Sequence, residues 1–182
     1  WSFAASELDP VSFSSAEKII AKNEKLGNSI QLRKQNSPRN VFAGIFQHTE
    51  QFDITICNPP FHVSASEANS GTKRKLKNLK KRKVEKIALN FGGQNNELWC
   101  PGGEKQFIRT MIQQSKNLEK SCLWFTSLVS KKTSLHSIYK GLEKVACTAI
   151  KTIEMTQGNK TSIVVCWTFK SETERKNWFK GR

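Results

Sequence analysis

The sequence predicts an α/β fold. Short runs rich in β-branched and aromatic residues alternate along the chain with segments whose apolar residues recur at helical spacing. The 182 residues suffice for one domain with a sizeable core. One strand-like run, residues 52–57, stops at two consecutive prolines, and open α/β sheets bind ligands at the carboxyl ends of their strands. The residues at that stop are therefore the first candidates for a functional site.

The first half of the chain is expected to contain three strands. They are predicted at residues 1–7, 29–33 and 52–57. The third run is dense in β-formers and is interpreted as buried. Asp9-Pro10 opens a helix that extends over residues 14–23. Residues 41–46 are a further apolar run, interpreted as either an edge strand or a short insertion.

The second half of the chain is expected to continue this alternation. Helices are predicted at residues 105–115, 135–145 and 172–180. Strands are predicted at residues 123–129, 149–155 and 163–169. The turn-forming segment at residues 156–160 joins the last two strands, which predicts a closing hairpin.

The candidate site is Asn58-Pro59-Pro60-Phe61. The prolines remove two backbone donors, and the residue before a proline is held extended, so Asn58 lies in a stiff turn. The Asn58 side-chain oxygen and the Pro59 carbonyl can each accept one N–H of an amino group on an aromatic ring. Two acceptors favour a pyramidal nitrogen whose lone pair points at an electrophile, and Phe61 can stack on the base. The alternative is a plain turn, with Asn58 as a capping residue and Phe61 in the core.

The chain is strongly basic, with 30 Lys+Arg against 15 Asp+Glu and a net charge of +15. Such an excess indicates a polyanionic partner, and nucleic acid is the usual one. The most basic stretch lies in a predicted insertion loop, residues 64–90, directly after the proline turn. Its predicted RNA-binding residues are Lys73, Arg74, Lys75, Lys77, Lys80, Lys81, Arg82 and Lys83. A solvated insertion without a partner is the alternative.

Cysteine usage favours the reducing cytoplasm. The five cysteines form no C-x-x-C pair, and no Cys/His cluster has zinc spacing, so no metal site is expected. Cys57, Cys122 and Cys166 lie in apolar strand-like runs and are predicted to be small buried hydrophobic residues. No apolar run approaches membrane-spanning length and no signal-peptide pattern opens the chain, so no membrane partner is expected.

Several separated motifs resemble those of one enzyme family. Asn58-Pro59-Pro60-Phe61, after a strand with Asp53, looks like the amino-methyltransferase signature of class I S-adenosylmethionine enzymes. The further matches are Phe91-Gly92-Gly93-Gln94, Glu97-Leu98-Trp99-Cys100, Gly102-Gly103-Glu104 and Trp124-Phe125-Thr126-Ser127-Leu128-Val129-Ser130. In this order they resemble the bacterial 23S ribosomal RNA adenine-N6 methyltransferases and, more distantly, a eukaryotic U6 small nuclear RNA methyltransferase. The resemblance extends from Trp1 to about Phe169.

The resemblance implies a fold, a reaction and a cofactor. The fold is a class I methyltransferase sheet, mostly parallel, with helices on both faces and a closing antiparallel hairpin. The reaction is methyl transfer from S-adenosylmethionine to N6 of an adenine in 23S ribosomal RNA, with that base unpaired or flipped out of its stack. The implied catalytic residues are Asn58, Pro59, Pro60 and Phe61. The implied cofactor contacts are Glu7, Arg33, Gln35 and Asn58.

Alternatives exist for the cofactor contacts. Glu7 ends the first predicted strand, where an acid accepts hydrogen bonds from ribose hydroxyls in nucleotide-binding α/β folds. Its other interpretation is an acid stabilised at a helix N-terminus. Arg33 and Gln35 follow the second strand, near the place of the cofactor adenine, and a solvated loop is the alternative for both.

The resemblance also implies a strand with a glycine-rich loop that this sequence does not contain, since no G-x-G occurs in it. We therefore expect one methyltransferase domain over residues 1–182 that lacks the amino-terminal part of the fold, with a gap beside the strand that leads to Asn58. Two other functions stay open. A glutamine-N5 methyltransferase acting on a release factor uses a similar turn, usually with Tyr in place of Phe61, and the basic loop argues against it. A non-catalytic RNA-binding fragment is the second alternative.

Overall fold

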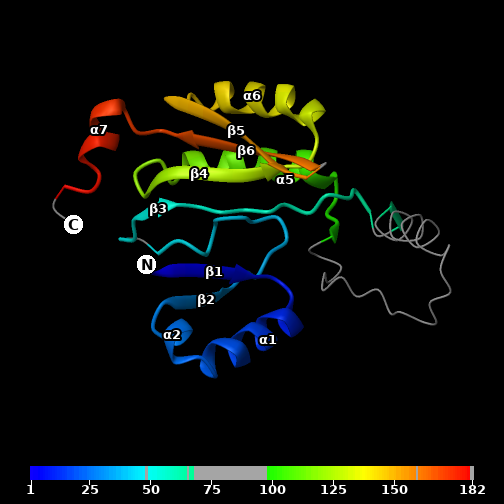
Figure 1. Ribbon diagram of the computed structural model, residues 1–182, viewed down its shortest axis with the longest axis vertical. Helices are drawn as coiled ribbons and strands as arrows, with labels where there is room; N and C mark the ends of the chain where they lie inside the picture. The colour runs from blue at the N-terminus through cyan, green and yellow to red at the C-terminus, as the bar shows by residue number, and fades with distance from the viewer. Residues whose placement is uncertain (48, 65, 68–97, 159, 181–182) are drawn as a thin grey trace.

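The computed structural model describes residues 1–47, 49–64, 66–67, 98–158 and 160–180 (Figure 1). The amino-terminal elements are β1 (Phe3–Glu7), α1 (Pro10–Ala21), α2 (Glu24–Gly27), β2 (Ile30–Lys34) and β3 (Phe52–Ile54). The carboxyl-terminal elements are α5 (Gly103–Lys116), β4 (Cys122–Val129), the 3-10 helix η1 (Lys132–Ser134), α6 (Leu135–Lys144), β5 (Ala149–Gln157), β6 (Lys160–Thr168) and α7 (Glu172–Asn177). The predicted α/β class is confirmed.

The strands form two sheets. β1 and β2 make a parallel pair, with Phe3 opposite Ile30. The second sheet has the order β3-β4-β6-β5, in which β3 is parallel to β4 and β6 is antiparallel to both of its neighbours. The antiparallel β5–β6 pair is the predicted closing hairpin. Figure 1 shows β1 and β3 at the facing edges of the two sheets, with no ladder between them.

The main core lies between the second sheet and the helices α5 and α6. Met111 and Ile112 from α5 and Leu142 from α6 are almost fully buried against the sheet residues Phe125 and Trp167. Each such side chain contributes about 1.5–3 kcal/mol through burial. The Trp167 indole Nε1–H donates to Ser115 Oγ at 2.9 Å, so the polar atom of this buried ring is satisfied. The apolar faces predicted for both helices thus form the core.

Residues 41–46 form turns and bends, so of the two interpretations of this run the edge strand is wrong. Phe42 and Ile45 are buried, as their hydropathy requires. The Gln114 side chain on α5 replaces the missing strand partner: its Oε1 accepts from the backbone N–H groups of Val41 and Phe42, each at 2.9 Å. These backbone N–H groups are satisfied by a side chain more than 70 residues away in the sequence, so the local sequence gives no sign of this contact.

The run at residues 52–57 also differs from its prediction, since the strand covers only Phe52–Ile54 and is not buried. Ile54 is 45% exposed and Ile56 is 82% exposed. The chain nevertheless stays alongside β4, because Thr126 Oγ1 donates to the Thr55 carbonyl at 2.6 Å and Thr126 N–H donates to Thr55 Oγ1 at 3.1 Å. These hydroxyl bonds interrupt the regular ladder and still guide the chain toward Asn58.

Helix ends follow local capping. α1 begins at Pro10, as predicted from Asp9-Pro10, and the Asp9 side chain accepts from the N–H groups of Val11 and Ser12. The predicted terminal helix ends at Asn177 instead of residue 180, and Ser171 and Glu174 form a capping box at its start. Helix α2 was not predicted.

Within the described ranges, no helix has the length and hydropathy to cross a membrane.

Candidate methyltransferase site

The Asn-Pro-Pro turn leaves the sheet at the carboxyl end of the β3 run. The Cys57 carbonyl accepts from Leu128 N–H at 2.9 Å, which anchors the residue before Asn58 to β4. Pro59 and Pro60 are buried, whereas Asn58 is exposed and Phe61 is 38% exposed. Two rigid, buried prolines therefore lie between the exposed Asn58 and Phe61, which agrees with the stiff turn predicted from the sequence.

The segment after the turn is fixed from two sides. His62 N–H donates to the Leu98 carbonyl at 3.0 Å, and Cys100 N–H donates to the His62 carbonyl at 3.1 Å. The first residue of α5, Gly103, packs so closely that a Cβ there would lie 2.8 Å from Val63 Cγ1. Its φ of +62° also favours glycine. The motif Gly102-Gly103-Glu104 therefore places the start of α5 directly against the segment that follows Phe61.

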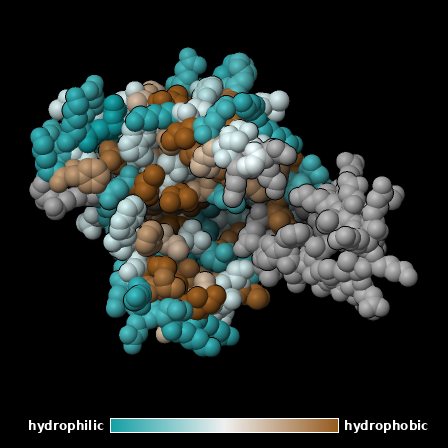
Figure 2. All heavy atoms as spheres, in the orientation of Figure 1, coloured by the Kyte–Doolittle hydropathy of each residue, from teal (hydrophilic) through white to brown (hydrophobic). Residues whose placement is uncertain are grey.

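A cleft of about 590 Å³ opens beside the turn, between the two sheets. Its walls are β1 on one side and the β3 run on the other, with buried Phe42 and Ile45 between them. Figure 2 shows the hollow between the upper and lower parts of the molecule, with hydrophobic residues gathered around it. Asn58 and Pro60 line this cleft together with Glu7 and Gln35. The fold thus brings together residues that lie far apart in the sequence.

Glu7 stands at the tip of β1. Its Oε1 accepts from the backbone N–H groups of Leu8 and Asp9, both at 2.7 Å, so half of the carboxylate fixes the turn into α1. Within the described part of the chain, Oε2 has no hydrogen-bond partner. The carboxylate lines the cleft, which is compatible with the ribose contact predicted for it, and that contact stays a prediction.

Gln35 lies in the cleft but its amide is engaged locally. Oε1 accepts from Asn36 and Ser37 N–H at 2.9 and 3.1 Å, and Nε2 donates to the Ala43 carbonyl at 3.1 Å. The side chain is only 8% exposed. Gln35 therefore shapes the loop that lines the cleft, and its predicted contact with a base has no support from these bonds.

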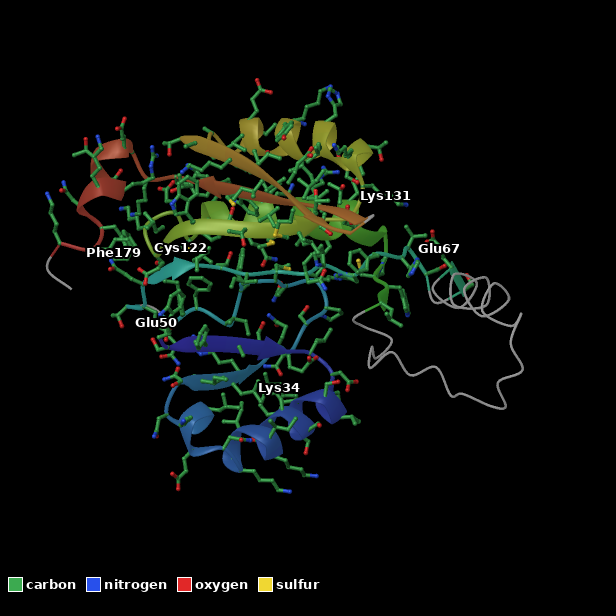
Figure 3. The ribbon with its side chains drawn as sticks, viewed as in Figure 1. Lys34, Glu50, Glu67, Cys122, Lys131 and Phe179 are labelled. Carbon is green, nitrogen blue, oxygen red and sulfur yellow. The ribbon has the colours of Figure 1, made fainter. Side chains whose placement is uncertain are left out.

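Arg33 is placed away from the cleft lining. Its guanidinium forms a two-pronged ion pair with Glu50, and Nη1 also donates to the Ile45 carbonyl at 2.6 Å. The hydrogen bond from Glu50 raises the pKa of Arg33, and the same bond lowers the pKa of Glu50. Figure 3 shows Glu50 near the start of β3, on the side of the molecule opposite Glu67. Arg33 therefore anchors the segment from Ile45 to Glu50 to β2, and its cofactor contact stays a prediction.

Several predicted residues lie outside the described residues. These are the RNA-binding set Lys73, Arg74, Lys75, Lys77, Lys80, Lys81, Arg82 and Lys83, and the motif residues 91–97. The cysteine prediction is tested and holds for Cys122 and Cys166, which are buried, while Cys57 is partly buried. Desolvation raises the pKa of Cys57 and of Cys122 to about 12, so both stay neutral thiols. No group of three or more His, Cys, Asp or Glu side chains gathers as a metal site in the ranges described.

Sequence reasoning missed the residues that position the turn. Thr55 and Thr126 connect the β3 run to β4, and Gln114 holds residues 41–43 under the cleft. Thr126 lies inside the Trp124–Ser130 motif, and that motif was the one available signal for it. Gln114 occurs in an ordinary helix, where local sequence carries no such signal.

The whole chain is similar to curated bacterial proteins named ribosomal RNA large subunit methyltransferase F. It is 50% identical over 182 residues to the protein of Cytophaga hutchinsonii, of which it covers 56%. The proteins of Shewanella denitrificans and Serratia proteamaculans are 46% and 49% identical, and 53% of each is covered. The match includes 100%, 100% and 98% of this chain, respectively. The chain thus spans about half the length of these relatives.

Solved structures show the same fold. The catalytic domain of human METTL16 in complex with MAT2A 3'UTR hairpin 1 has a TM-score of 0.76 at 25% identity, over 94% of this chain and 57% of that one. The N-terminal domain of human METTL16 in complex with SAH has a TM-score of 0.65 at 22% identity, over 94% of this chain and 53% of that one. These likenesses confirm the predicted class I methyltransferase fold.

A family model agrees with these similarities. The family described as RNA methyltransferase matches residues 1–171, which include β1, the Asn-Pro-Pro turn and the closing hairpin. This is the family that the separated sequence motifs predicted. The chain therefore belongs to this family of RNA methyltransferases.

Proposed function

We propose that the protein of which this chain forms part transfers a methyl group from S-adenosylmethionine to N6 of an adenine in 23S ribosomal RNA. The relatives named ribosomal RNA large subunit methyltransferase F, up to 50% identical to this chain, support an RNA substrate from the large subunit. The solved METTL16 complexes with RNA and with SAH support the same pairing of substrate and cofactor. The adenine and its N6 are implied by the Asn-Pro-Pro-Phe signature.

One observation carries the proposal: an exposed Asn58 amide lies in the same cleft as the Glu7 carboxylate. Among the described residues, no hydrogen bond ends on the Asn58 side chain or on the Pro59 carbonyl. The Asn58 amide is therefore available to a substrate in the cleft, whereas Pro59 is almost fully buried and is not part of the cleft lining, so the contact from its carbonyl stays a prediction. Available acceptors on a rigid turn are what an amino group needs for orientation.

The residues fit the proposed cofactor. Pockets for small ligands measure roughly 300–1,000 Å³, and this cleft has about 590 Å³. Glu7 Oε2 is an acceptor without a partner in the described ranges, and it suits a ribose hydroxyl. When bound, S-adenosylmethionine supplies a methyl group on a positively charged sulfur, which is already a strong electrophile.

Each residue of the turn has a role in the proposed reaction. Asn58 Oδ1 and the Pro59 carbonyl each accept one N–H of the adenine amino group, which localises the nitrogen lone pair and points it at the methyl carbon. Phe61, still partly exposed, stacks on the base and fixes its plane. Pro60 stays buried and keeps both acceptors in place. Catalysis then rests on positioning, and no strong base is required.

A further strand is part of the proposal. Among the described strands, β1 and β3 lie at the facing edges of the two sheets beside the cleft, and an open strand edge is a template for pairing with a further strand. We propose that a strand carrying the predicted glycine-rich loop fills this place and completes the cofactor site. The predicted basic loop, residues 64–90, remains our proposed contact to the RNA backbone.

The test uses the full-length protein with radiolabelled S-adenosylmethionine and 23S ribosomal RNA. The expected result is label in RNA that digests to N6-methyladenosine at one position. Release factor protein is assayed in parallel, and label on one of its glutamines instead of on RNA would identify the competing activity. Tight RNA binding without any transfer would overturn the proposed reaction in favour of a binding protein.

A further inference from the structure

Helices α5 and α6 enclose a second cavity, separate from the cleft beside Asn58. It has a volume of about 430 Å³ and lies on the outer side of the two helices. Its floor is apolar and includes Ile112 and Ile138, which also belong to the core. Ile112 and Ile138 are themselves only 1% and 3% exposed, and the space above them exists because α6 carries Gly141 here: a Cβ at this position would lie 3.5 Å from Ile112 Cδ1. A glycine inside a helix weakens the helix, so the open space has a cost in stability.

Four cations surround this cavity. Lys105 and Arg109 come from α5, and Lys140 and Lys144 come from α6. All four are exposed, and none takes part in an ion pair within the described residues. The two helices carry only two acids, the buried Glu104 and the exposed Glu143. A groove with four cations and one exposed acid creates a positive potential that attracts an anionic ligand.

The groove starts at the same edge of the sheet as the Asn-Pro-Pro turn. α5 connects the parallel strands β3 and β4, and α6 connects β4 to β5, which is parallel to β4 because both are antiparallel to β6. Both helices therefore begin where the strands end. Figure 3 shows Lys131, just past β4, on the same side of the molecule as Glu67, with Cys122 on the opposite side. Lys105 lies in the first turn of α5, two residues after the glycine that packs on Val63.

We propose that the groove between α5 and α6 binds the RNA strand that flanks the target nucleotide. This inference rests on the proposed function, because it takes RNA as the substrate. The four cations pair with successive phosphates, and the apolar part of the lining, which includes the partly buried Val145, receives the face of a ribose or base. RNA that enters here continues from the catalytic edge along the outer face of the protein, away from the cleft.

The test compares two full-length variants that lose the same charge. The first changes Arg109→Gln, Lys140→Gln and Lys144→Gln in the groove. The matched control changes Lys18→Gln, Lys22→Gln and Lys25→Gln, which are exposed on and after α1 and unpaired among the described residues. The slope of log K against log salt for RNA binding should flatten by roughly 2 units in the groove variant. In the control variant this slope should equal that of the unmodified protein within experimental error.

A third variant, Gly141→Leu, fills the groove without changing its charge. RNA affinity should fall in this variant too, while its S-adenosylmethionine affinity stays as in the unmodified protein and its thermal unfolding midpoint is at least as high, since a helix-interior glycine is removed. Equal salt slopes in the groove and control variants would overturn the proposal, and so would full affinity of the filled groove. If the groove variants bind naked RNA normally and lose affinity only for ribosomal particles, the groove binds a protein and the proposal is wrong.

The two proposals fail in different ways. If the unmodified protein methylates no RNA, the proposed function fails whatever the groove variants do. If the unmodified protein methylates its RNA normally and the groove variants bind it as the control does, the groove proposal alone fails.

Discussion

Glu104 Oε2 accepts hydrogen bonds from both the backbone N–H and the hydroxyl of Ser130, at 2.9 Å for the N–H. Glu104 is the second residue of α5 and is 5% exposed, and Ser130 directly follows β4. The bond therefore connects the two sequence motifs that end at these residues. It holds the start of α5, which packs on the segment after Phe61, to the carboxyl end of the central strand.

We expect Ser130→Ala to destabilise the protein by about 1–2 kcal/mol, since it removes a hydrogen bond to a buried carboxylate. Urea unfolding monitored by circular dichroism measures the difference. Ser15→Ala removes an exposed hydroxyl on α1 and should change stability by less than about 0.5 kcal/mol. Equal effects of the two substitutions would mean that the Glu104 bond is not a stabilising contact.

Asn58→Ala should reduce methyl transfer by the full-length protein by about 10²-fold or more, because one of the two acceptors for the amino group is lost. The fold should be unaffected, since the Asn58 side chain is exposed and makes no hydrogen bond within the described residues. Steady-state kinetics with RNA and circular dichroism test both expectations. Asn28→Ala, at the exposed C-cap of α2, is the matched control. Full activity of Asn58→Ala would refute the proposed orientation of the amino group.

Thr126→Val should weaken the attachment of the β3 run, because valine keeps the shape and loses the hydroxyl that donates to the Thr55 carbonyl at 2.6 Å. The expected loss of stability is about 1–3 kcal/mol, with a lower kcat since Asn58 follows this run. Thr161→Val, exposed on β6, serves as the control. A Thr126→Val protein with unchanged unfolding and unchanged kcat would show that the backbone alone guides the turn.

The Arg33–Glu50 ion pair predicts a pH dependence. The hydrogen bond from Arg33 lowers the pKa of Glu50 below its ordinary value of 4.5 in the folded protein. The ion pair's contribution to stability is therefore complete above pH 4.5 and is lost as the pH falls through the lower, folded value. Unfolding free energies measured from pH 6 to pH 3 should show this loss in the unmodified protein. The loss should be smaller in Glu50→Gln and unchanged in Glu17→Gln, an exposed control; parallel curves for all three proteins would contradict it.

Residues 1–182 expressed alone should associate, because β1 and β3 leave two strand edges open toward the cleft. Light scattering after size exclusion is expected to give species larger than the 20.7 kDa chain. Addition of a segment that supplies the proposed strand should restore a single monomeric complex. A 20.7 kDa monomer that binds S-adenosylmethionine tightly without any addition would overturn the proposed strand.

The α/β class, the order of the main elements, the closing hairpin and the family can all be predicted from the amino-acid sequence. Hydrophobic periodicity and turn residues act locally, so they can be recognised along the chain, and Asn58-Pro59-Pro60-Phe61 is a local rigid turn. The helical faces of α5 and α6 are predictable for the same reason, because burial selects apolar residues at helical spacing.

The tertiary structure alone decided which polar side chains are engaged. Gln114 replaces a strand partner for residues 41–43. Arg33 pairs with Glu50 instead of lining the cleft. The exposure of Ile54, likewise, follows from the position of β3 at the edge of its sheet. These relationships join residues distant in the sequence, and a hydrogen-bonding side chain looks the same in the sequence whatever its partner. Their outcome depends on how the sheets, loops and helices pack in space.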